Sequence, residues 1–492
     1  MKMKRIYLLF LVLITVVSAC ELTDNIDPKS AREVAPSSLL TNAQESFVDV
    51  VDEISMNVNI SRFLAQYCSQ TAYTQESRYN FSDRQIPDSY WNQCYRSTLI
   101  DLKDAKDILA KIDLTVEDNL ARDNKVAIIE IIEVYIYHTM IDYFGDIPYS
   151  EALMGMENLT PVYDDAQTVY VNLMGKLDDA YDVLDANYGS WGAEDLFFSG
   201  DIAMWKKTAA SLKLRLAMRL AEVDATTAQT EAEDAISKGL FEEGEGLVLH
   251  WFGQDPYVNT IYRRFEIDGR TDYAPSKTII DKMLDLNDPR MSSYFTQVDT
   301  SGEGDFVYWG LPYGLDANVN VKSYSTFAPE MFEADYPSVL IHYDEVQFLL
   351  AEAAQRTYTT PMTAQEHYEE AITASVEYWT GSDDGVTAYL GEADVAWDAN
   401  RWKELIGTQK WLALYNRGNE GYATWRIFDW PVLSPPPDMT QEDIPLRWPY
   451  PFNELDLNPD NYQAAASAIG GDDVRTQIFW DVTPNSATPS PN

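Results

Sequence analysis

Helical periodicity is the feature that most constrains this fold: it recurs along the chain, whereas the alternation typical of strands is scarce. In residues 123–143 the apolar positions cover most of a helix circumference. A helix that is apolar on nearly all sides has to be surrounded by other elements, so we expect this segment to be the central helix. Gly145 and Pro148 should end it, because glycine permits a left-handed cap and proline cannot continue a helix.

Further helical segments occur in pairs. Residues 164–184 and 205–220 each carry apolar residues on one face, and we expect these two helices to pack antiparallel. Residues 343–356 and 364–379 form another pair, joined by a short turn that contains Pro361. This unit has about the length of one tetratricopeptide repeat. The sequence therefore predicts a mostly α protein with a tetratricopeptide-like helical-repeat scaffold, degenerate because the pairs share no strict sequence identity.

Two long segments, 67–95 and 244–336, interleave aromatic residues with amides and carboxylates, and the second has little helical period except after Pro275. Aromatic faces beside hydrogen-bonding groups suit a sugar, whose C–H groups stack on a ring, and they also suit a peptide. For any single ring, packing inside a loop is the more common role, so only the clustering favours a site. The candidate ligand-binding residues are Tyr73, Arg78, Tyr79 and Trp91 from the first segment and Trp251, Tyr257 and Trp309 from the second.

The N-terminus has the pattern of a secretory signal. Residues 2–5 are mostly basic, residues 6–17 are apolar except for Thr15, and small residues precede Cys20. The apolar run is too short to span a bilayer, and the small residues allow a peptidase to cut before the cysteine. We expect Cys20 to be acylated, with palmitate for example, and to anchor the mature chain in a membrane outside the cytoplasm. The alternative is an ordinary cleaved signal with a cysteine there by chance.

Charge and cysteine content narrow the possible partners. The chain has 36 basic and 79 acidic residues, a formal net charge of −43, so it should repel nucleic acid and anionic membrane surfaces. This charge also keeps a surface protein soluble. Besides Cys20 only Cys68 and Cys94 are present. They could form one disulfide in an oxidising compartment or remain two buried thiols, and the sequence favours neither.

Motifs for catalysis or metal binding are nearly absent. The four histidines show no zinc-ligand spacing, and neither a nucleophile elbow nor a phosphate-binding loop occurs. Residues 299–305 place oxygen ligands like the start of a calcium loop, but the twelfth position is Gly310, where a bidentate Glu is needed. Pairs of carboxylates are uninformative in so acidic a chain. The sequence therefore predicts no catalytic site, no metal and no cofactor.

Several longer strings resemble one family. They are 142–152 (DYFGDIPYSEA), 336–337 with 343–354 (YDEVQFLLAEAA), 409–414 (QKWLAL), 420–426 before Pro431, 447–453 (RWPYPFN), Asn458, 461–462 and 480–481. Because they lie in order over nearly the whole mature chain, the sequence resembles the SusD/RagB family, in particular the SusD-like nutrient-binding lipoproteins of Bacteroidetes. Residues 427–430 (IFDW) depart from the basic, Gly-containing turn of many relatives.

The resemblance implies a non-enzymatic surface protein of the outer membrane. Such a protein would capture an oligosaccharide or a peptide on its aromatic loops and deliver it to a SusC-like TonB-dependent transporter, on which it would sit as a lid. The strings that carry the resemblance are scaffold residues, and we expect Trp411, Tyr415, Trp425 and Trp480 to pack between helices. Two alternatives remain: a surface glycoside hydrolase, and a helical-repeat scaffold that binds partner proteins.

The expected organisation follows from these segments. Residues 1–19 would be the signal peptide, 20–40 the lipidated N-terminus and tether, 41–482 a single SusD-like domain, and 483–492 a C-terminal tail. Within the domain, the loop-rich segments 67–95 and 244–336 would carry the ligand-binding insertions.

Overall fold

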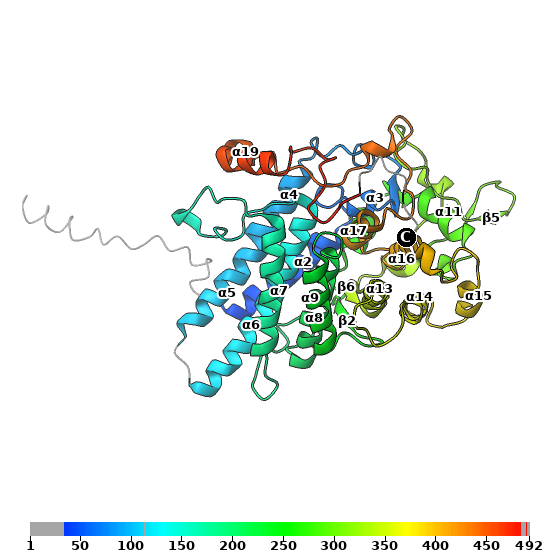
Figure 1. Ribbon diagram of the computed structural model, residues 1–492. Coiled ribbons are helices and arrows are strands. Elements are labelled where there is room, and N and C mark those ends of the chain that lie inside the picture. Colours follow the sequence, from blue (N-terminus) through cyan, green and yellow to red (C-terminus); the bar gives the residue numbers. More distant parts are fainter. Residues whose placement is uncertain (1–33, 113–114, 484–488, 490–492) are drawn as a thin grey trace, which may run out of the picture.

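A computed structural model describes residues 34–112, 115–483 and 489, and it is mostly helical as predicted (Figure 1). The expected signal peptide, Cys20, most of the tether and most of the C-terminal tail lie outside the described residues. The first described helix, α2 (Pro36–Asp52), begins inside the segment assigned to the tether, and its Leu40 is fully buried. No helix in the described part of the chain has the length and apolar character needed to cross a membrane.

The central helix is α6 (Val116–Phe144), which includes the predicted segment 123–143. Its apolar residues are buried on successive positions, Ile128 and Ile129 among them, as a helix surrounded on most sides requires. It contacts α2, α5 (Ile100–Lys111), α7 (Ala166–Val183) and α8 (Ile202–Arg219). Gly145 ends it with φ +79° and ψ −124°. The positive φ was expected, but this ψ lies outside the left-handed helical region.

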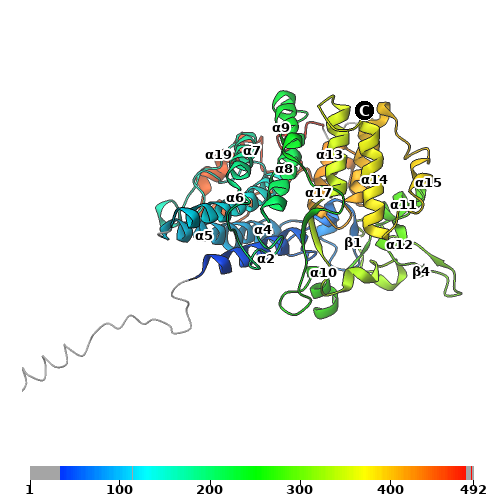
Figure 2. The same cartoon turned by 90° about the horizontal axis from the view of Figure 1, so that it is seen from below.

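The remaining helices continue from α6 as a stack of neighbouring pairs, visible in Figure 2. The predicted pairing of α7 with α8 is confirmed, and α8 also packs on α9 (Ala225–Lys238) and α13 (Tyr343–Gln355). The second predicted pair, α13 and α14 (Ala364–Thr380), is confirmed as well. The stack ends with α16 (Trp402–Ala413) and α17 (Gly418–Phe428). This is the helical-repeat scaffold that the sequence predicts.

Short strands and helices occupy the segments between these pairs. Within the described residues the strands form three antiparallel pairs: β1 (Cys68–Gln70) with β3 (Tyr273–Pro275), β2 (Gly246–Leu249) with β6 (Ser338–His342), and β4 (Val298–Asp299) with β5 (Phe306–Val307). The short helices are α3 (Ser61–Leu64), α4 (Ile86–Asn92), α10 (Thr260–Tyr262), α11 (Lys277–Asp285), α12 (Met291–Tyr294), α15 (Val386–Leu390), α18 (Glu454–Leu457) and α19 (Pro459–Ala468). Helix α11 directly follows Pro275, where the sequence predicts helical period to return.

Aromatic side chains fill the spaces between helices. Trp411, Tyr415, Trp425 and Trp480 are at most 2% exposed, so their predicted packing role is confirmed. Cys68 and Cys94 are both buried and both free. Of the two possibilities, the structure therefore has two separate thiols and not a disulfide between them. Burial raises the pKa of the Cys68 thiol to about 12, which keeps it protonated and unreactive.

Candidate functional site

The β1–β3 pair brings the two aromatic segments of the sequence together. Its register pairs Cys68 with Pro275 and Gln70 with Tyr273. A third segment runs beside it: the Leu311 N–H donates to the Pro275 carbonyl at 2.9 Å. Eight residues later, the Val319 N–H donates to the carbonyl of Thr71 at 2.8 Å. Residues 71–79, 271–276 and 309–325 therefore form one hydrogen-bonded surface, which we call the β1–β3 face.

Two exposed rings lie toward opposite ends of this face. Leu311 marks one end of the face, and Trp309 lies two residues before it. Trp309 is 51% exposed. Its main chain is fixed, because the Trp309 N–H donates to Ser325 Oγ and the Ser325 N–H donates back to the Trp309 carbonyl, both at 2.9 Å. Tyr73 follows β1 at the other end and is 55% exposed. Exposed aromatic faces on a fixed main chain are suited to stacking with a ligand.

Tyr73 is held in an unusual conformation. Its φ is +54°, in the region that residues with a side chain rarely adopt. The Arg84 guanidinium lies 5.7 Å from the centroid of the ring, a cation–π contact. Such strain persists only where the surroundings impose it, and it is concentrated at functional sites. In the 309–325 segment, most of the exposed residues after Leu311 are polar: Asp316, Asn318, Asn320 and Lys322. They offer donors and acceptors between the two rings.

Arg78 and Tyr79 hold the 309–325 segment of this face in place through their side-chain contacts. Arg78 donates to both carboxylate oxygens of Asp438, at 2.8 and 2.9 Å, and to the Gly314 carbonyl at 3.0 Å. It therefore ties the 309–325 segment to the loop that contains Asp438. The Tyr79 ring is half-buried and packs against Tyr313 at 6.2 Å between centroids. Burial raises the pKa of Tyr79 well above its ordinary value, so the phenol stays neutral.

The other two candidates of the second segment lie in the loop after β2. Trp251 is 6% exposed, and its Nε1–H donates to Ser338 Oγ at 2.9 Å, so the ring packs inside the protein. Tyr257 is 41% exposed and forms an edge-to-face pair with Phe252, whose ring is 67% exposed. This pair is a second exposed aromatic surface, outside the hydrogen-bonded segments of the β1–β3 face. Phe252 was not among the predicted residues, because its position beside Trp251 gives no sign of which ring is exposed.

Trp91 belongs to neither surface. It lies on α4 and is 8% exposed, between Phe144 at 5.2 Å and Tyr163 at 5.9 Å. It lines a groove of about 220 Å³ that Leu159 and Leu457 also border. The structure therefore brings Tyr73, Arg78, Tyr79 and Trp309 together on one face and separates Trp91 from them.

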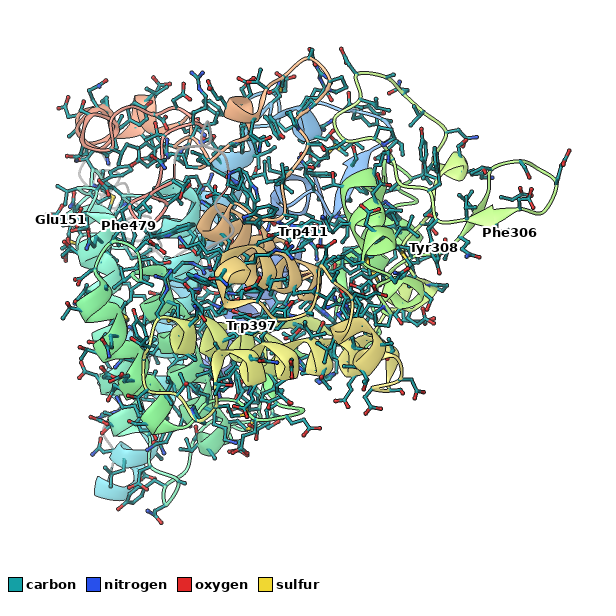
Figure 3. The ribbon with its side chains drawn as sticks, turned by 45° about the vertical axis from the view of Figure 1, so that its right-hand side comes forward. Glu151, Phe306, Tyr308, Trp397, Trp411 and Phe479 are labelled. Atoms are coloured by element: carbon teal, nitrogen blue, oxygen red, sulfur yellow. The ribbon has the colours of Figure 1, made fainter. Side chains whose placement is uncertain are left out.

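A hairpin that the sequence did not predict projects beside Trp309. Figure 3 shows the β4–β5 hairpin extending outward, with Phe306 near its end and Tyr308 closer to the body. Phe306 is 60% exposed and Tyr308 half-buried. The signal was present as the unbroken apolar run 306–309. In the turn, the Asp299 carboxylate accepts N–H groups from Ser301, Gly302 and Gly304, so the loop itself satisfies these oxygens.

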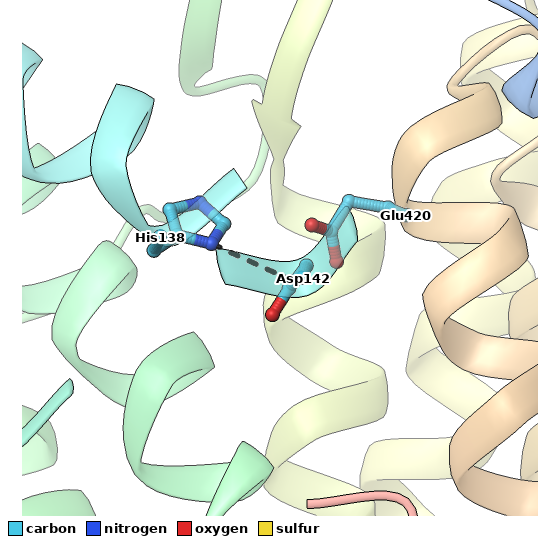
Figure 4. A group of neighbouring side chains, drawn as sticks. All are labelled: His138, Asp142 and Glu420. Atoms are coloured by element: carbon cyan, nitrogen blue, oxygen red, sulfur yellow. Dashed lines mark ion pairs between the residues drawn. The ribbon is translucent and has the colours of Figure 1, made fainter. Parts of the chain in front are cut away.

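A buried group of His138, Asp142 and Glu420 has the composition of a metal site (Figure 4). Both carboxylates, however, already have a cationic partner, because Arg219 lies 3.3 Å from Asp142 and 2.7 Å from Glu420. Burial lowers the pKa of His138 and keeps the imidazole neutral. A divalent ion would have to displace a guanidinium from the protein interior. We therefore interpret this group as part of the ion-pair network that joins the helices.

Comparisons with known proteins identify the family. The model of a SusD-like family, described as starch-binding and associating with the outer membrane, matches residues 28–451. A chitin-binding protein of known structure is 28% identical, with 91% of this chain and 100% of that chain covered and a TM-score of 0.78. A SusD homologue from Bacteroides uniformis is 27% identical, with 90% and 99% covered and a TM-score of 0.77.

A chitin-binding SusD homologue from Flavobacterium johnsoniae is 24% identical, with 91% and 99% covered and a TM-score of 0.77, which supports the fold. No curated protein matched the sequence. The family model covers most of the chain, and the helical-repeat scaffold agrees with it. The chain therefore belongs to the SusD-like family.

Proposed function

We propose that this protein is a cell-surface glycan-binding protein that captures an oligosaccharide on its β1–β3 face. The observation that carries the proposal is the placement of two exposed rings, Tyr73 and Trp309, toward opposite ends of one hydrogen-bonded surface with polar side chains between them. Rings contribute stacking on the C–H faces of a sugar, and the polar groups take its hydroxyls. The family description and the chitin-binding neighbour favour a glycan over a peptide.

The proposal extends to uptake. Acylated Cys20 would hold the protein in the outer membrane, and the bound oligosaccharide would pass to a SusC-like TonB-dependent transporter, over which the protein acts as a lid. Binding without bond cleavage needs no catalytic group. Gentle detergent extraction of the lipoprotein from its native membrane tests this step: a co-purifying TonB-dependent barrel supports it, and repeated isolation of the folded lipoprotein alone contradicts it.

The binding step is tested with purified protein and oligosaccharides from starch and chitin, by calorimetry. Trp309→Ala and Tyr73→Ala should each raise the dissociation constant about tenfold, the equivalent of one stacking contact. Both residues are exposed, so the melting temperature should be unchanged. Trp251→Ala is the matched control, because it removes a buried ring and should lower the melting temperature. Unchanged affinity in both exposed-ring variants, with binding retained, would contradict the β1–β3 face as the site.

The glycoside hydrolase alternative has a separate test. The mature protein is incubated with the same oligosaccharides and with the parent polysaccharides, and new reducing ends are measured. We expect none, and their release would replace the binding function with a catalytic one.

A further inference from the structure

A second surface is built from two loops that are distant in sequence. Residues 150–162 form the loop that extends outward below α19 in Figure 1, and residues 452–461 include α18 and the start of α19. Asn458 Nδ2 donates to the Pro161 carbonyl at 2.8 Å, and Asn461 Nδ2 donates to the Thr160 carbonyl at 2.9 Å. We call residues 150–162 and 452–461 together the loop-pair surface.

This surface exposes many large apolar side chains. Those at least 39% exposed are Met154, Met156, Leu159, Val162, Leu455 and Leu457. Single exposed apolar residues are ordinary on a protein, but a contiguous group marks an interaction surface. Neighbouring backbone is strained at Leu153, whose φ is +61°. The two loops are held by hydrogen bonds to one another, so the group is a fixed feature of the fold.

A preformed groove lies within the loop-pair surface. Its volume is about 220 Å³, and its lining includes Trp91, Leu159, Pro161 and Leu457. The floor is rigid because Trp91 packs on Phe144 of the central helix, whose side chain is fully buried. Most of the lining is aliphatic, and its two aromatic residues, Trp91 and Tyr95, are each only 8% exposed. A sugar needs an open ring face to stack on, so this groove suits an apolar side chain of a protein better than a glycan.

The loop-pair surface is acidic. Glu157, Asp456 and Asp460 are exposed, and none of the three forms an ion pair within the described residues. Glu157 lies between Met156 and Leu159 in the chain, and Asp456 lies between Leu455 and Leu457. Exposed apolar residues and acidic residues therefore follow one another closely along both loops. A partner that inserts apolar side chains here would meet negative charge around them and would be favoured by basic flanks.

We infer that the loop-pair surface docks a segment of a partner protein that carries apolar anchor residues flanked by Lys or Arg. The inference does not depend on the proposed glycan function, because it uses other residues and predicts a different class of ligand. Loss of oligosaccharide binding in Trp309→Ala and loss of docking in loop-pair variants are thus separate outcomes.

Site-directed photo-cross-linking in intact cells of the producing organism tests the inference. A benzophenone amino acid replaces Leu159 or Leu457 in the full-length lipoprotein, and Leu284 of α11, which is 47% exposed, is the matched control position. We expect the same partner protein to be cross-linked from 159 and from 457, with a yield about fivefold above that from 284. Mass spectrometry of the adduct should locate a segment with apolar residues and adjacent Lys or Arg.

Two positions guard against failure of one variant to fold, and circular dichroism of each purified variant checks the helical content. The inference is overturned if neither position gives a protein adduct, or if the control position gives the same adduct. An adduct to a glycan, to lipid or to a second copy of this acidic chain would overturn it equally.

The charge requirement has its own measurement. Glu157→Gln with Asp456→Asn should lower the cross-link yield from Leu159 about threefold at low salt and remove its salt dependence. Glu303→Gln with Asp305→Asn, exposed acids of the β4–β5 hairpin, is the matched control and should change neither. An equal effect of both double variants would show that only the overall charge matters, and it would refute a specific basic partner segment.

Discussion

Arg219 on α8 and Glu420 on α17 form a buried ion pair of 2.7 Å between positions 201 residues apart in the sequence. Asp142 at the end of α6 lies 3.3 Å from the same guanidinium. One turn before Arg219, Arg215 lies 2.7 Å from Glu345 of α13. Four helices of the scaffold are thus joined through charges that are almost fully buried. Removing one partner from such a network leaves an uncompensated buried charge.

We therefore expect Arg219→Met to destabilise the protein by about 3–5 kcal/mol, because Glu420 and Asp142 would lose a partner. Denaturant unfolding followed by circular dichroism measures the change. The double variant Arg219→Met/Glu420→Leu should recover part of the loss, because it removes the unpaired charge as well. A loss below 1 kcal/mol for the single variant would contradict a structural role of this pair.

A glycine of α17 allows close packing. A Cβ atom at Gly421 would lie 2.1 Å from the Tyr67 hydroxyl oxygen, far inside van der Waals contact. Tyr67 is buried and cannot move away without disturbing Trp411, whose ring lies 5.1 Å from it. Gly421→Ala should therefore lower the free energy of unfolding by about 1–3 kcal/mol.

The matched control is Gly175→Ala in the exposed part of α7, where nothing lies within 4 Å of the added Cβ. This change should raise stability by up to about 1 kcal/mol, since alanine favours a helix interior over glycine. Thermal melts of both variants separate the two effects. Equal shifts of the melting temperature with the same sign in both variants would contradict close packing at Gly421.

A buried carboxyl near the C-terminus predicts a pH effect. Burial raises the pKa of Asp481 to about 8, with Arg426 opposing the rise and Asp429 adding to it. For a carboxyl whose folded pKa is raised, the contribution to stability is complete below the unfolded pKa and is lost as pH rises through the folded pKa. Asp481→Asn removes this loss. The melting temperature of the variant relative to the parent protein should therefore increase between pH 5 and pH 8.

The comparison is made at both pH values in the same buffer series. Asp473→Asn is the control, because Asp473 is an exposed carboxylate paired with Arg475 at 3.0 Å and has a lowered pKa. The melting temperature of Asp473→Asn relative to the parent protein should not increase between pH 5 and pH 8. The melting temperatures of Asp481→Asn and the parent protein could instead differ by the same amount at pH 5 and at pH 8. That result would contradict a buried carboxyl that binds a proton in this range.

The Arg78–Asp438 pair should affect ligand binding more than folding. Asp438 is 67% exposed, so the pair contributes at most about 1 kcal/mol to stability. Arg78→Ala nevertheless frees the 309–325 segment from the loop that contains Asp438. We expect oligosaccharide affinity to fall several-fold while the melting temperature changes little, measured by calorimetry and thermal melts. Arg475→Ala, which breaks an exposed pair elsewhere, should leave the affinity unchanged; a similar fall there would contradict the role of Arg78.

Much of the scaffold could be predicted from the sequence. The all-round apolar pattern of residues 123–143 identified α6, because only a surrounded helix can bury every side. The periodicity also located the α13–α14 pair, and the rings of Trp411 and Trp425 were correctly expected to pack between helices. These features depend on local pattern and on the single physical requirement that apolar surface be buried.

The exposure of each ring could not be predicted in this way. Trp251 and Trp309 lie in the same loop-rich segment, yet one is 6% and the other 51% exposed. The difference arises because Trp251 finds a hydrogen-bond acceptor in Ser338, 87 residues away, whereas Trp309 lies outside the packed region. No local pattern encodes a partner at that distance.

The sequence by itself determined a helical scaffold with two aromatic-rich insertions, since periodicity and composition are properties of neighbouring residues. Only the tertiary structure decided that Tyr73 and Trp309 share a face. That face exists because β1 pairs with β3 and because Thr71 Oγ1 donates to the Thr271 carbonyl 200 residues further along the chain. Such pairing depends on how the whole scaffold positions its loops, and this is settled only when the helices have packed.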